Sequence, residues 1–161
     1  IRNCLVGSEM CIRDRLNTPD TGMAVSLDVG DANSIHPPSK FILGKRLAYW
    51  ALNKNYGFSS VNFSGPVYKS LEIKENKVLV KFDFAENGLH CPDDLINNFE
   101  LASEDKIFYP ANAKIIWNQL EVQSDQVKNP VHVRYGWKNY LNGNLYNVRG
   151  LPASSFRSDN W

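Results

Sequence analysis

The chain has few of the residues that mark several large classes of protein. Its 161 residues include only three cysteines, three histidines and two methionines, and the formal net charge is +1. Lysine and arginine nowhere form a run, so the sequence lacks the basic face that nucleic acid or an anionic membrane surface requires. No uninterrupted apolar stretch reaches the ~18 residues of a membrane span. The composition therefore predicts neither a nucleic-acid partner nor a membrane partner.

Residues 1–15 are set aside as an artefact. Leu5–Arg15 looks like a translated sequencing-library adapter, and nothing in it has a sustained helical or strand period. We therefore expect 1–15 not to be native and the chain to be the carboxyl-terminal fragment of a longer protein. Removing the three basic and two acidic residues of this segment from totals of 18 and 17 leaves 15 of each sign. Cys91 is then the one remaining cysteine, which rules out an internal disulfide.

Residues 16–57 are predicted to form a strand, a loop and a helix. The apolar stretch Met23–Val29 is the expected strand, and Gly30 ends it. Pro37 and Pro38 favour extended backbone before Ser39 opens the helix. This is the expected final strand–loop–helix element of a larger α/β domain, and it places His36 at the carboxyl end of a strand, where open α/β sheets bind their ligands.

The expected helix has one apolar stripe and ends near Gly57. The stripe recurs at spacings of three and four and consists of Leu43, Leu47, Trp50 and Ala51. The basic side chains are expected mostly off this stripe; they are Lys40, Lys45, Arg46 and Lys54.

Residues 58–161 change to a period of two, which predicts short antiparallel strands. The strand segments are Val67–Ile73, Val78–Phe84, Ala113–Trp117, Leu120–Gln123 and Val131–Tyr135, with polar turns after the first and third. We therefore expect 58–161 to be a β-rich carboxyl-terminal domain of the β-sandwich type. The predicted fold class is α/β plus β.

Several blocks of the chain resemble the sialate O-acetylesterases, which are SGNH-type serine hydrolases. These blocks are Gly22–Lys40, Gly44–Ala48, Ser64–Tyr68, Asn129–Trp137 and the tail from Gly143 to Trp161. The resemblance implies hydrolysis of O-acetyl esters on sialic acids without a metal or organic cofactor. It implies as partners an O-acetylated sialic acid or other acetylated glycan, and the missing amino-terminal part of the chain's own hydrolase domain. It also implies a secreted, periplasmic or lysosomal location.

The resemblance implies that His36 is the general base, which takes the proton of the serine nucleophile and passes it to the leaving sugar hydroxyl. Many SGNH hydrolases carry an aspartate three residues before this histidine, but Asn33 occupies that position here. The group that orients the imidazole is therefore left open between the Ser34 backbone carbonyl and the Asp31 carboxylate. The carbonyl is favoured, because the segment after Asp31 must bend sharply before that side chain could reach back.

The nucleophile and the oxyanion hole are not found in this sequence. Ser8 lies in the adapter-like segment and only 27 residues before His36, so it is rejected as the nucleophile. The fragment alone is therefore expected to be inactive. The histidines and Cys91 lack metal-ligand spacing, so no metal site is predicted.

Two other functions remain open. An esterase of the same scaffold could act on acetylxylan or another acetylated carbohydrate, because a fold does not set specificity. The β-rich region could instead be a non-catalytic carbohydrate-binding or structural module. A sugar platform would draw on the aromatic residues Trp117, Tyr135, Trp137, Tyr140 and Trp161, although aromatics on alternating strands are more often packed inside.

Overall fold

The computed structural model describes residues 18–160 apart from 35 and 37, so the adapter-like segment 1–15 lies outside the described residues. The chain forms two compact units. The first contains residues 18–64 together with Lys138–Asn142, and the second contains Gly65–Trp137 and the residues from Gly143 onward. Within the described part of the chain, no helix has the length and apolar character needed to cross a bilayer.

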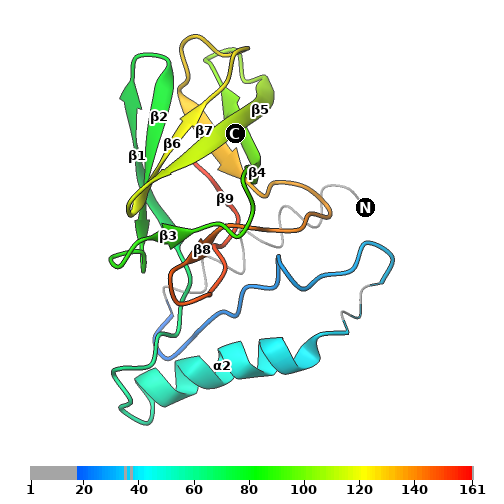
Figure 1. Ribbon diagram of the computed structural model, residues 1–161, viewed down its shortest axis with the longest axis vertical. Helices are drawn as coiled ribbons and strands as arrows, with labels where there is room; N and C mark the ends of the chain where they lie inside the picture. Colours follow the sequence, from blue (N-terminus) through cyan, green and yellow to red (C-terminus); the bar gives the residue numbers. More distant parts are fainter. Residues whose placement is uncertain (1–17, 35, 37, 161) are drawn as a thin grey trace. The chain divides into compact units, whose positions relative to one another are not determined.

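The second unit is built on an antiparallel sheet of seven strands (Figure 1). Their order across the sheet is β1-β2-β6-β5-β4-β7-β9, and a separate two-stranded sheet pairs β3 with β8. The strands are β1 Val67–Lys74, β2 Lys77–Asp83, β3 Leu89–His90, β4 Ile96–Ala102, β5 Phe108–Ile116, β6 Gln119–Gln123, β7 His132–Tyr135, β8 Tyr146–Asn147 and β9 Phe156–Arg157. The predicted antiparallel β-rich region is confirmed.

The two predicted hairpins form with tight turns. Lys74 pairs with Lys77 at the end of the β1–β2 hairpin, and Ile116 pairs with Gln119 at the end of the β5–β6 hairpin. The predicted alternation of buried and less buried side chains along β2 is also confirmed up to Phe82, because Val78, Val80 and Phe82 are all buried. Phe84 lies beyond the end of this strand at a φ of 61°.

Aromatic packing brings the two outer strands of the sheet together. The Phe156 ring of β9 stacks on the Tyr68 ring of β1, with centroids 4.7 Å apart and planes 14° apart. Phe82, Phe99 and Tyr135 surround Phe156 at centroid distances of 5.8, 6.2 and 6.0 Å. The sheet therefore curls around one core, which is consistent with the sandwich-like expectation.

A buried carboxylate fastens the carboxyl-terminal segment. Arg134 donates to both oxygens of Asp159 at 2.7 and 2.8 Å, and Arg157 donates to the same carboxylate. The Asp159 side chain is fully buried, and the Arg134 guanidinium also lies 3.7 Å from the centroid of the Phe108 ring. Burial raises the pKa of Asp159, but the hydrogen bonds from Arg134 and Arg157 outweigh it and hold the pKa below its ordinary value.

The first unit is organised on a single described helix, α2 Lys40–Lys54, as expected from the sequence. The chain leaves the helix through Gly57 at a φ of 74°, a left-handed conformation that glycine adopts without strain. The strand expected over Met23–Val29 does not form. Residues 21–26 are unpaired with any strand, and residues 27–29 form a turn in which Val29 N–H donates to the Ser26 carbonyl at 3.1 Å.

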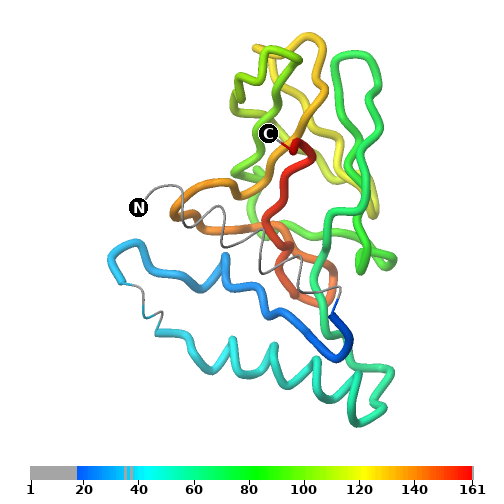
Figure 2. Tube along the Cα trace, turned by 180° about the vertical axis from the view of Figure 1, so that it is seen from behind, coloured from blue at the N-terminus to red at the C-terminus, as the bar shows by residue number. Residues whose placement is uncertain are grey.

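The physical reason for the missing strand is the lack of a neighbour. A parallel strand needs another strand to receive its backbone hydrogen bonds, and the described residues of this unit provide none. The segment before His36 instead runs alongside α2, as both Figure 1 and Figure 2 show. Side chains of the helix, instead of a neighbouring strand, donate hydrogen bonds to the backbone of this segment.

The two side chains that donate these hydrogen bonds are Arg46 and Trp50. Arg46 donates to the Val25 carbonyl at 2.6 Å and forms a two-pronged ion pair with Asp28 at 2.7 and 2.6 Å. Trp50 Nε1 donates to the Met23 carbonyl at 2.9 Å, and its ring lies so close to Gly22 that a Cβ there would be 2.5 Å away. The helix face that packs inward is thus centred on Arg46 and Trp50.

This arrangement corrects the predicted helix face. Arg46 was placed off the apolar stripe but is 7% exposed, whereas Leu47 was placed on the stripe and is 54% exposed. The apolar pattern predicted the wrong face because it treats every arginine as exposed, whereas a guanidinium can be buried when carboxylate and carbonyl oxygens accept its hydrogen bonds.

Arg46→Met is expected to loosen the segment before His36. It would leave the Asp28 carboxylate buried without its partner, a change that costs about 3–5 kcal/mol when a buried pair is broken. The measurement is amide hydrogen exchange at residues 22–30, together with urea unfolding. Lys45→Met, on the exposed side of the same helix, is the control and should change neither; equal exchange in the two variants would show that the ion pair does not hold the segment.

The Asp159 cluster predicts loss of stability in acid. Because the pKa of Asp159 is lower in the folded state, its contribution is complete above the ordinary value of 3.8 and is lost as the pH falls through the folded value. The difference in unfolding free energy between the wild type and Asp159→Asn should therefore shrink as the pH is lowered from 6 to 2. Asp125→Asn, at an exposed position, should follow the wild type throughout; a constant difference for Asp159→Asn would contradict the assignment.

Candidate functional site

The loop that carries His36 is held by two local turns. Asp31 Oδ1 accepts the Asn33 backbone N–H at 2.8 Å, which closes an Asx turn. Asp31 and Ser34 also form an isolated antiparallel bridge. One step further, the His36 backbone N–H donates to Ser34 Oγ at 3.0 Å. The backbone of His36 is therefore tied to Ser34, and Ser34 to Asp31.

The His36 side chain is exposed to solvent. Its imidazole makes no hydrogen bond to any residue that the structure describes, and its neighbours Ile35 and Pro37 are outside the description. An exposed imidazole with an available nitrogen can take a proton from a hydroxyl group brought to it. The geometry is therefore compatible with a general base.

The side chains of the two residues predicted to orient His36 bond to nearby backbone groups. The Asp31 carboxylate accepts the N–H of its own turn, and the Ser34 hydroxyl bonds to the backbone of His36, also contacting its carbonyl oxygen at 3.3 Å. The choice between the Ser34 carbonyl and the Asp31 carboxylate as the orienting group stays a prediction.

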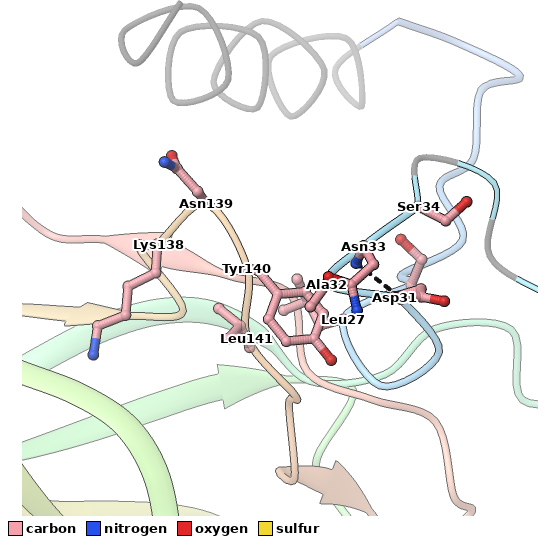
Figure 3. A pocket seen from close by; sticks show the side chains of 11 residues that line it. Leu27, Asp31, Ala32, Asn33, Ser34, Lys138, Asn139, Tyr140 and Leu141 are labelled. Atoms are coloured by element: carbon pink, nitrogen blue, oxygen red, sulfur yellow. Dashed lines mark hydrogen bonds between the residues drawn. The ribbon is translucent and has the colours of Figure 1, made fainter.

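A cleft with a volume of about 580 Å³ opens next to this loop (Figure 3). One wall is formed by residues of the stretch 26–34, and the other by Lys138, Asn139, Tyr140 and Leu141. Both walls belong to the first unit. Ser34 is one of the lining residues, and its hydroxyl accepts the backbone N–H of His36, so the cleft and His36 share the same loop.

Local sequence signals could not have located the second wall. Lys138–Asn142 follows the β7 region by a few residues, yet it belongs to the first unit, more than a hundred residues away from Asn33 in the chain. Tyr140 stood out in the sequence only as one aromatic residue among several. Of the others, Tyr135 is fully buried in the sheet core, and Trp161 is outside the described residues.

Metal-ligating side chains do not gather anywhere in the described part of the chain. No group of three or more histidine, cysteine, aspartate or glutamate side chains lies close enough together to hold a metal ion. Cys91 is a free thiol whose pKa is raised by its partial burial, which makes it a weak nucleophile.

Comparison with known proteins finds a likeness among the solved structures. No family model matches the sequence, and no curated protein matches it. The fold is similar to the crystal structure of a novel carbohydrate acetylesterase from Xanthomonas citri, with a TM-score of 0.89 and 36% sequence identity. The match covers 94% of this chain and 35% of that protein, so the chain spans about a third of the length of the structure that it resembles.

Proposed function

We propose that this chain is the carboxyl-terminal part of a carbohydrate O-acetylesterase and supplies its general base, His36. The observation that carries the proposal is the likeness to a carbohydrate acetylesterase, which extends over 94% of the chain at 36% identity. The exposed imidazole beside a cleft supports it independently. The strand–loop–helix element would then be the end of an SGNH hydrolase domain.

The exposed surface of the first unit agrees with a larger hydrolase domain. Phe41 and Leu47 of α2 are 82% and 54% exposed, and Phe58 just beyond the helix is 55% exposed. Large apolar side chains gathered on one element are usually covered by other parts of a protein. The Met23–Val29 segment would also gain a neighbouring strand there, which would account for its strand-like sequence.

In this reaction the nucleophile is a serine from polypeptide outside this chain. Its hydroxyl oxygen attacks the acetyl carbonyl carbon while His36 takes the hydroxyl proton. The ester bond to the sugar breaks, and His36 returns the proton to the leaving sugar oxygen. Water then attacks the acetyl-serine carbonyl carbon while His36 takes its proton; the bond to the serine oxygen breaks, His36 returns the proton to that oxygen, and acetate is released.

Two substrate classes are in competition. The sequence resemblance favours O-acetylated sialic acids, which carry a carboxylate. The cleft favours a neutral acetylated glycan, because Lys138 is the one cation among its lining residues and its amine is directed away from the Tyr140 ring (Figure 3). A site for a sialic acid needs a cation or several N–H donors aimed at the carboxylate.

Replacement of the proposed base tests the function. In the complete protein, recovered with its upstream coding sequence, His36→Ala should lower kcat for an acetylated glycan by at least about 10⁴-fold, because the serine loses the group that takes its proton. The measurement is acetate release. His90→Ala, an exposed histidine of β3, is the matched control and should retain full turnover. Undiminished acetate release by His36→Ala would disprove the proposal.

A further inference from the structure

The cleft next to the His36 loop joins two stretches that are remote in the sequence. The stretch 26–34 forms the wall that leads to His36, and residues 138–141 return to form the opposite wall. Its volume of about 580 Å³ is in the range of small-molecule sites. The reaction proposed above gives the returning segment no role.

Tyr140 is the most distinctive side chain of the returning segment. Its ring packs against the turn at Gly30, where an added Cβ would lie 3.8 Å from the Tyr140 Cε2 atom. Leu27 and Ala32 lie beside the ring in Figure 3, and the neighbouring Leu141 is 8% exposed. Tyr140 itself remains 49% exposed. A ring supported on one side and accessible on the other is suited to stacking against a sugar ring.

Polar groups beside the ring suit a neutral ligand. The Asn33 side chain lines the cleft next to Tyr140, and an amide can both donate to and accept from sugar hydroxyls. The one carboxylate among the lining residues, Asp31, is engaged with the Asn33 backbone N–H. The one amine, that of Lys138, is directed away from the ring (Figure 3). The surface around Tyr140 therefore presents an aromatic face and amide groups rather than a charge.

We infer that this cleft binds the ring of a neutral acetylated sugar, with Tyr140 as the stacking residue and Asn33 as a hydrogen-bonding residue. Ser34 lines the cleft and is hydrogen-bonded to the backbone of His36, so the acetyl ester of the bound sugar would face this part of the loop. The assignment of the ester rests on the proposed function, whereas binding of the sugar can be measured without any catalysis.

Binding is tested on the 161-residue chain with acetylated xylotriose as the probe. NMR signals of the Tyr140 ring and the Asn33 side-chain amide should shift saturably, and Tyr140→Ala should weaken binding about tenfold, as expected for loss of an aromatic contact. Tyr56→Ala, which removes a tyrosine that is 72% exposed elsewhere in the same unit, should leave the affinity unchanged. No saturable shift, or tighter binding of an O-acetylated sialic acid, would overturn the inference.

Kinetics of the complete protein provide the second test. Tyr140→Ala should raise KM for acetylated xylotriose about tenfold while leaving turnover of 4-nitrophenyl acetate, which has no sugar ring, unchanged. Tyr140→Phe keeps the ring and should retain the wild-type KM. Equal losses on both esters would show a structural role for Tyr140 and contradict the inference.

Failure of the esterase proposal and failure of the sugar-site inference give different results. If the complete protein hydrolyses neither ester but the chain still binds acetylated xylotriose through Tyr140, the esterase proposal is wrong and the sugar site stands. If it hydrolyses acetylated xylotriose with the same KM in the wild type and in Tyr140→Ala, the esterase proposal stands and the sugar site is wrong.

Discussion

The ion pair between Arg46 and Asp28 is the interaction on which the candidate site depends. The backbone before His36 has no strand beside it in the described unit, so its carbonyl groups need other donors. Arg46 donates a hydrogen bond to the Val25 carbonyl and also neutralises Asp28. Trp50 donates a hydrogen bond to the Met23 carbonyl. Both carboxylate and guanidinium are 9% exposed, which strengthens their attraction compared with a surface pair. The helix thereby fixes the start of the loop that ends at His36.

The loop and the cleft illustrate interactions of different range. The Asn33 N–H donates to the Asp31 carboxylate, and the His36 N–H donates to the Ser34 hydroxyl. Each hydrogen bond joins residues two apart in the chain, a local turn that aspartate and serine commonly form. The cleft needs the return of Lys138–Asn142 to the first unit after the chain has passed through β1 to β7 of the second. A proposed sugar site thus combines a locally determined loop with a wall contributed by a distant part of the chain.

The regular elements were predictable to different degrees for physical reasons. The hairpins β1–β2 and β5–β6 were found because alternating side chains and a polar turn are local signals. The interior strand β4 was missed, although Phe99 and Leu101 are buried, because its segment lacks a clear alternation and is held by β5 and β7 on either side. The strand expected over Met23–Val29 was wrong because a strand exists only when a neighbour accepts its hydrogen bonds.

The sequence by itself determined the helix that begins after Ser39, the change to antiparallel strands after it, and His36 as the residue to examine. These follow from periodicity, from turn chemistry and from a family resemblance carried by contiguous blocks. Only the tertiary structure decided that Arg46 lies inside, that Met23–Val29 packs on a helix, and that Tyr140 faces the loop of Asn33. Each of these depends on which distant groups satisfy a buried charge, a backbone carbonyl or an aromatic face, and no local pattern contains that information.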